Sequence, residues 1–137
     1  MATLKISDIS VGDWVRDKGK ECTVASIYMA AEGYPSEVAL TRQGICSGCA
    51  YIDYLEPIPI TAEILEKNGF ESTTNPNVFT LTHGELQLYV SKEFDGWYMS
   101  FVNFRERLCI LQVIRQGFIH QLQHALRLAG VDKEINL

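Results

Sequence analysis

Two histidines near the end of the chain, His120 and His124, have the spacing that points most directly to chemistry. On a helix, residues four apart share a face, as in the zinc-binding helix H-E-x-x-H of metalloproteases. That reaction also needs the glutamate, because its carboxylate takes a proton from the zinc-bound water. Gln121 stands at this position, and an amide cannot act as the base. The sequence therefore predicts no protease site in this segment.

A second metal hypothesis adds Cys46 and Cys49, which are separated by a Ser-Gly pair. Together with His120 and His124 they would supply the four ligands of a Cys2His2 structural zinc site. About 70 residues lie between the two pairs, whereas roughly 12–15 do so in a zinc finger. The favoured interpretation is a hairpin turn at Ser-Gly with reduced cysteines on either side. It expects no metal and no cofactor, and the composite zinc site stays the alternative.

Aromatic residues and arginines alternate in the segment 96–107, GWYMSFVNFRER. If one face of this strand were open, Trp97 could stack on bases while Arg105 and Arg107 contacted phosphates. The favoured interpretation places the aromatic side chains in the core instead. A net charge of −5 also opposes broad nucleic-acid binding, which needs a basic surface. Nucleic acid is therefore the alternative partner and not the expected one.

Composition bounds the class of protein. A chain of 137 residues suits one compact domain or two small ones. With 47% hydrophobic and 21% charged residues it has the composition of a globular protein and not of a disordered one. No apolar run is long enough to span a bilayer, and the first residues lack the apolar core of a signal peptide. We expect a cytoplasmic protein with reduced thiols and no membrane partner.

The first 57 residues predict a small all-β domain. Short segments rich in Val, Ile, Tyr and Thr alternate with turn residues, as is typical of strands. The predicted strands are 13–16, 22–29, 37–42 and 50–55. So many short strands in so few residues favour an SH3-like β-barrel or a strongly bent sheet.

The segment 55–61, LEPIPIT, predicts a domain boundary because its two prolines cannot donate ladder hydrogen bonds. A helix then begins after Thr61 as N-cap and ends at Gly69, which suits the left-handed position after a helix. The remaining elements are strands 78–82, 86–90, 97–104 and about 107–113 and a helix 118–129. The prediction is thus an α+β protein whose residues 58–137 form an α-β4-α unit, an antiparallel meander with two helices.

Helical periodicity orients the last helix. Its core stripe contains Phe118, Leu122, Ala125 and Ala129. His120 and His124 fall on the opposite side, which we expect to face solvent.

Three blocks of the sequence carry a resemblance. They are LKISDISVGDWV, with a G-[ND]-W-V motif; LEPIPITAEILEKNGF, with P-I-P-[IL]-T and N-G-F; and FIHQLQHAL, with [YF]-[IV]-H-x-L-Q. The chain resembles a family of uncharacterised small proteins of Bacteroides-type bacteria, their phages and mobile elements. The resemblance implies a shared fold but no activity. Members of this family often have asparagine at the position of His124, which weakens the zinc hypothesis. His120 and Gln123 remain as residues that either bind a partner or form hydrogen bonds to the meander. We favour the hydrogen bonds.

The expected function is non-enzymatic. The chain has no G-x-S-x-G, P-loop or G-x-G-x-x-G motif, and no catalytic residue is predicted. We expect an accessory protein of a phage or mobile element that binds a protein partner or itself, through the barrel edge or the final helix. The candidate binding residues are Trp97, Arg105, Arg107, His120 and Gln123.

Overall fold

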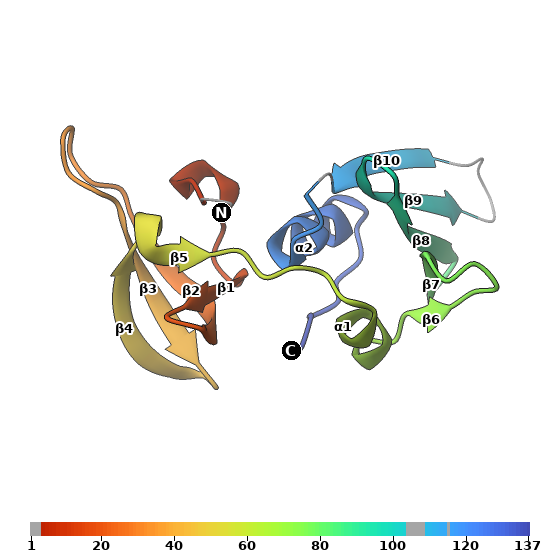
Figure 1. Ribbon diagram of the computed structural model, residues 1–137, viewed down its shortest axis with the longest axis horizontal. Helices are drawn as coiled ribbons and strands as arrows, with labels where there is room; N and C mark the ends of the chain where they lie inside the picture. The colour runs from red at the N-terminus through yellow and green to blue at the C-terminus, as the bar shows by residue number, and fades with distance from the viewer. Residues whose placement is uncertain (1–3, 104–108, 115) are drawn as a thin grey trace. The chain divides into compact units, whose positions relative to one another are not determined.

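The computed structural model describes residues 4–103, 109–114 and 116–137. The chain divides into two compact units, Met1–Ile58 and Pro59–Leu137, one residue after the predicted boundary. Each unit is built on an antiparallel sheet, and the second adds two α-helices (Figure 1). The predicted α+β class is therefore confirmed. Within the described ranges, no helix is long and apolar enough to cross a membrane.

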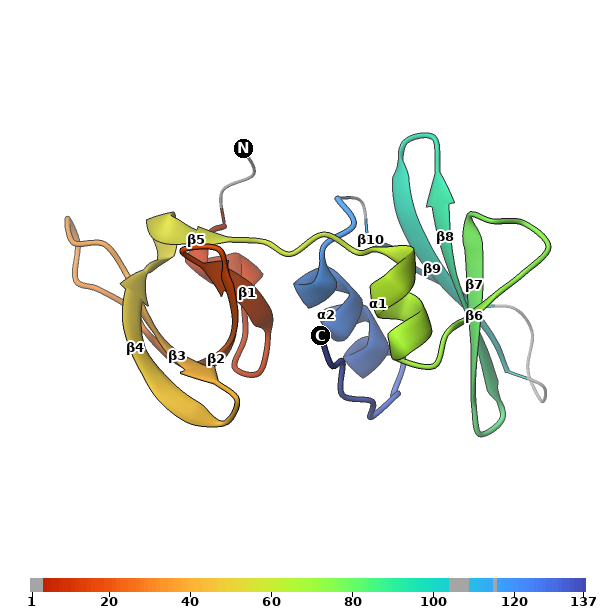
Figure 2. The same cartoon turned by 60° about the horizontal axis from the view of Figure 1, so that its bottom comes forward.

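The first unit is a five-stranded sheet in the order β4-β3-β2-β1-β5. Its elements are η1 (Ile6–Asp8), β1 (Trp14–Asp17), β2 (Lys20–Tyr28), β3 (Glu37–Arg42), β4 (Ile45–Tyr51), η2 (Ile52–Tyr54) and β5 (Leu55–Glu56). The sheet curves strongly (Figure 2), but no pairing between β4 and β5 closes it within the described residues. The bent sheet is therefore the form observed, and the closed barrel is not.

The turn between β3 and β4 corrects one expectation. It lies at Gln43-Gly44, with φ of 53° and 76°. Two successive residues with positive φ are what a two-residue hairpin turn requires. Ser47 and Gly48, predicted as the turn, lie instead inside β4, beside a register irregularity in its pairing with β3. A Ser-Gly pair signals a bulge as well as a turn, and the sequence alone does not distinguish the two.

The core of the first unit lies on one face of its sheet. Its fully or largely buried residues are Leu4, Ile9, Val15, Cys22, Val24, Val38, Leu40, Ile52 and Leu55. Cross-strand partners alternate between this face and the opposite one, as the pleat requires. Ile27, Val38 and Ala50 form one inward-facing row across β2, β3 and β4. The adjacent row of side chains along these strands projects from the opposite face and contributes to the site described below.

The second unit has a five-stranded sheet in the order β10-β9-β8-β7-β6, with both helices on the same side (Figures 1 and 2). Its elements are α1 (Ala62–Lys67), β6 (Glu71–Ser72), β7 (Val78–His83), β8 (Leu86–Glu93), β9 (Gly96–Asn103), β10 (Cys109–Ile114) and α2 (Ile119–Leu128). Four strands were predicted. The fifth, β6, has two residues, which is too short to leave a period-two pattern in the sequence.

The ends of α1 follow the sequence signals. Thr61 Oγ1 accepts a hydrogen bond from the Ile64 N–H at 3.2 Å. At the other end, the Gly69 N–H donates to the Glu66 carbonyl at 3.1 Å and the Phe70 N–H donates to the Leu65 carbonyl at 3.0 Å. Gly69 has φ of +87°, which suits a residue without a Cβ. The predicted N-cap and C-terminal stop of this helix are both confirmed.

Asn68 connects α1 to the last residues of the chain. Its Nδ2 donates to the carbonyl oxygens of Ile64 and Asn136, each at 2.7 Å. Its Oδ1 accepts from the Asn136 N–H, also at 2.7 Å. The side chain is buried, so these bonds satisfy polar groups that burial would otherwise penalise. The Asn68 side chain therefore joins the C-terminal segment to α1, in addition to the burial of Val131 and Ile135.

Candidate functional site

Gln121, which stands where a metalloprotease would have its glutamate, has a structural role in α2. Its Oε1 accepts a hydrogen bond from the Phe118 N–H at 3.1 Å, and its Nε2 donates to Gln116 Oε1 at 3.2 Å. Phe118 is the N-cap, so the amide satisfies one of the backbone donors exposed where a helix begins. The side chain caps a helix in the place where the protease motif carries a base.

His120 does not face solvent as expected, since only 2% of its surface is exposed. Its ring lies 5.9 Å from the Phe118 ring and nearly parallel to it, and 5.9 Å from the His124 ring at 76°. The prediction from helical periodicity was wrong because it assumes that only one side of the helix packs against the rest of the protein. Ile119, His120, Leu122, Ala125 and Leu126 are all buried, and His124 and Gln123 are half-buried. Both predicted residues of this helix, His120 and Gln123, are thus inaccessible or only partly accessible to a partner.

The cysteines and histidines of the zinc hypothesis belong to different units. Cys46 and Cys49 lie exposed on β4 in the first unit, and His120 and His124 lie on α2 in the second. In the parts of the chain that the structure describes, no group of three or more His, Cys, Asp or Glu side chains is arranged to hold a metal. The composite zinc site stays an alternative hypothesis.

The face of β9 that carries Trp97, Met99 and Phe101 is partly buried. Met99, next to Trp97 on this face, is buried, and its cross-strand partner Val90 is also buried. Trp97 itself is half-buried against Gly117, where an added Cβ would lie 2.1 Å from the indole Cδ1. Lys92 Nζ lies 6.0 Å from the centre of the indole. Trp97 thus packs against Gly117 and also lines a pocket of about 340 Å³ together with Lys92. Arg105 and Arg107 lie outside the described residues.

A surface that sequence reasoning missed lies on the first unit. Five large side chains, each with 42% to 79% of its surface exposed, gather where β2, the following loop, β4 and η2 meet. We call this the tyrosine surface; its residues are Tyr28, Met29, Tyr34, Tyr51 and Tyr54. Exposed aromatic residues in a cluster are unusual, because each would lower its free energy by burial.

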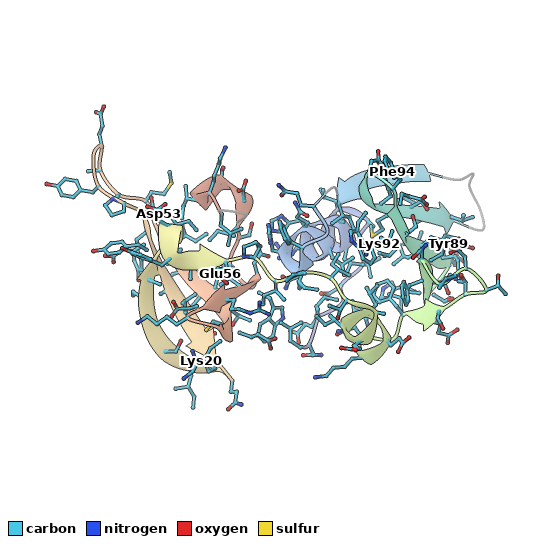
Figure 3. All side chains as sticks on the ribbon, viewed as in Figure 1. Lys20, Asp53, Glu56, Tyr89, Lys92 and Phe94 are labelled. Atoms are coloured by element: carbon cyan, nitrogen blue, oxygen red, sulfur yellow. The ribbon has the colours of Figure 1, made fainter. Side chains whose placement is uncertain are left out.

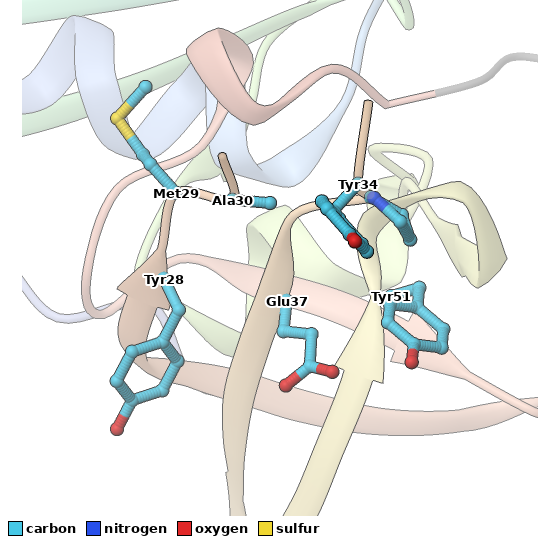
Figure 4. A pocket seen from close by; sticks show the side chains of 7 residues that line it. Tyr28, Met29, Ala30, Tyr34, Glu37 and Tyr51 are labelled. Atoms are coloured by element: carbon cyan, nitrogen blue, oxygen red, sulfur yellow. The ribbon is translucent and has the colours of Figure 1, made fainter. Parts of the chain in front are cut away.

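The tyrosine surface encloses a pocket of about 290 Å³. It is lined by Tyr28, Met29, Ala30, Tyr34, Pro35, Glu37 and Tyr51 (Figure 4). Tyr54 lies beside the pocket, with its ring centre 6.3 Å from that of Tyr51. The loop 29–36 is held at two points: the Ala30 N–H donates to Ser36 Oγ at 3.4 Å, and the Ser36 carbonyl accepts from the Ile52 N–H at 3.0 Å.

The surroundings of the tyrosine surface are acidic. Residues 28–56 contain four acids and one base: Glu32, Glu37, Asp53, Glu56 and Arg42. Figure 3 shows Asp53 and Glu56 on η2 and β5. Arg42 is at the far end of β3, where its Nη2 donates to Cys22 Sγ at 3.5 Å. The surface therefore combines aromatic rings with acidic residues, of which Glu56 has Arg16 of β1 as its cross-strand partner.

Comparison with known proteins leaves the site to be judged on its geometry. No protein-family model, no curated protein and no solved structure matches this chain.

The sequence carries one signal that could have pointed to the tyrosine surface. Four of the six tyrosines fall within 28–54, a stretch whose only basic residue is Arg42. Because acidic residues mostly lie on the surface, tyrosines among them are candidates for an exposed cluster.

Proposed function

We propose that this protein is a non-enzymatic interaction protein and that it binds a protein partner through the tyrosine surface of its first unit. The observation that carries the proposal is the exposure of five large side chains, four of which line one pocket. Tyrosine is enriched at protein interfaces because it buries a large area at the cost of few rotatable bonds, while its hydroxyl still accepts and donates hydrogen bonds.

The charge of this surface favours a partner over a second copy of the chain. A two-fold dimer would place the same acidic surface against itself, and like charges brought together oppose association. Nucleic acid is disfavoured for a similar reason, because its phosphates would meet Glu32, Glu37 and Asp53. A basic or neutral segment of another protein meets neither obstacle.

We also propose that the first unit is SH3-like. Its four-stranded meander β1-β2-β3-β4 is followed by the single 3-10 turn η2 and by β5, which returns to pair with β1. This order supports the assignment, although the sheet of the described residues is open. The function does not depend on the assignment, since a binding surface is defined by its side chains.

Selection from a phage-displayed library of random peptides, with the full chain as bait, tests the proposed function. Enriched peptides are then synthesised with a fluorophore and titrated against purified variants. We expect Tyr34→Ala and Tyr54→Ala each to weaken binding about tenfold, which corresponds to about 1.4 kcal/mol and to the usual loss at an interface hot spot.

Ile45→Ala provides the matched control. Ile45 is as exposed as the tyrosines and lies in the same unit, but at the hairpin end of β4. It should leave the affinity unchanged. The proposal is wrong if no peptide is enriched over an unrelated bait, or if the enriched peptides bind both tyrosine variants as tightly as the parent chain.

A further inference from the structure

Three residues of the tyrosine surface form one row across the sheet. Tyr28 on β2 is the direct partner of Glu37 on β3, and Glu37 is the direct partner of Tyr51 on β4. Direct partners project from the same face of a sheet, and this row lies on the face opposite the core row of Ile27, Val38 and Ala50. Figure 4 shows the Glu37 carboxylate between the two rings.

The dimensions of the row suit a cation. Neighbouring strands lie about 4.8 Å apart, so the backbones of Tyr28 and Tyr51 are about 10 Å apart across Glu37. A positive group over Glu37 would have a tyrosine on either side of it in the row, and a ring attracts a cation that lies within roughly 6 Å of its centre. It would also lie over a carboxylate.

Glu37 is available for such a pairing. Its side chain is half-buried, and within the described residues no side-chain hydrogen bond or ion pair of Glu37 is present. Glu32, in the loop that follows β2, and Asp53, two residues after Tyr51, add negative charge to the same part of the chain. A carboxylate flanked by two aromatic rings, without a basic residue of its own chain, is electrostatically complementary to a cationic side chain of a partner.

We propose that the Tyr28–Glu37–Tyr51 row binds an arginine side chain in an extended segment of the partner protein. The guanidinium plane stacks on a tyrosine ring while its N–H groups donate to the Glu37 carboxylate, a combination that the ammonium group of lysine cannot reproduce. Beside it, Met29, Tyr34 and Pro35 line the rest of the pocket and accept an apolar neighbour of the arginine. This inference rests on the proposed function and names the chemistry of its ligand.

The test uses a minimal ligand on the full chain. N-acetyl-arginine N-methylamide is titrated into isotope-labelled protein and followed by amide chemical shifts. We expect saturable shifts in the millimolar range centred on Tyr28, Glu37 and Tyr51. The citrulline counterpart has the same shape without the charge and should produce none. The lysine counterpart should bind several-fold more weakly.

Two matched variants separate the row from general acidity. Glu37→Gln should reduce the affinity about fivefold or more, whereas Glu32→Gln changes the net charge equally and should leave it within about twofold. Glu37 is on the outer face without a bond to lose, so a dispersed amide spectrum should be retained in both variants. Equal binding of citrulline, equal losses in the two variants, or shifts centred elsewhere would overturn the inference.

The two proposals fail in different ways. If selected peptides lose affinity in Tyr34→Ala and Tyr54→Ala but not in Glu37→Gln, the protein-binding function stands and the arginine site does not. If the arginine derivative binds at Glu37 while no selected peptide depends on Tyr34 or Tyr54, the row is a site for small cations and the proposed function is wrong.

Discussion

The bonds of Asn68 give the most direct test of how the second unit is held together. Replacing Asn68 with alanine removes three hydrogen bonds of 2.7 Å, one to the Ile64 carbonyl and two to the backbone of Asn136. The Ile64 carbonyl keeps a bond from the Asn68 N–H at 3.2 Å, and the backbone of the exposed Asn136 can bind water instead. The expected loss in the free energy of unfolding is therefore that of the three hydrogen bonds, because their backbone partners keep another hydrogen bond or can bind water.

The size of the expected destabilisation follows from the number of hydrogen bonds lost. At a net value of about 1 kcal/mol for each hydrogen bond, the free energy of unfolding should fall by about 2–4 kcal/mol. In urea, with a slope of about 2 kcal/mol/M, the midpoint for the second unit should fall by about 1–2 M. Thermal unfolding should shift downward by about 10–20 °C for a unit of this size.

Asn136→Ala is the matched control for Asn68→Ala. Asn136 takes part in the same contact, but only through its backbone, so its substitution should change stability by less than about 0.5 kcal/mol. Asn68→Asp keeps the acceptor and faces two carbonyl oxygens with a carboxylate, so its loss should be at least as large as that of alanine. The reasoning is refuted if Asn68→Ala unfolds at the same urea concentration as the parent chain, or if Asn136→Ala is equally unstable.

The remaining predictions concern packing and thiol accessibility. Gly117→Ala should destabilise the protein by about 2 kcal/mol more than Gly84→Ala, as measured by urea unfolding. Both glycines have positive φ, but only at Gly117 would the added Cβ meet the Trp97 indole. Equal losses of stability would show that backbone strain alone matters. In native protein, iodoacetamide should modify the two cysteines of β4 quickly and Cys22 only after unfolding, as read by mass spectrometry of peptides, because Cys22 is fully buried. Rapid native labelling of Cys22 would contradict its position in the core.

Local signals in the sequence were sufficient for some elements. The N-cap Thr61 and the stop at Gly69 define α1, because capping depends on residue types a few positions apart. The final helix was predicted as 118–129 and is observed as Ile119–Leu128. Asn68 shows the limit: its position in N-G-F predicts the end of a helix, but its partner Asn136 lies 68 residues away.

The site depends on information that local patterns do not contain. The row of Tyr28, Glu37 and Tyr51 requires the register of three strands, and that register includes irregularities between Val24 and Ser26 and between Leu40 and Thr41. A shift of one residue in either pairing would turn the partner side chains to the opposite face. The sequence supplied the residue types and their charge, and the fold decided which of them meet.

The position of Gln121 in α2 shows how the start of a helix changes the meaning of a motif. If glutamate replaced it, the letters would read H-E-x-x-H, yet the new carboxylate would inherit the bond from the Phe118 N–H and would be held in the first turn. The same five letters placed two turns later would leave that carboxylate free. Pattern searches for zinc hydrolases would therefore gain specificity by reading the distance between motif and helix start, since a capping acid is already committed to the backbone.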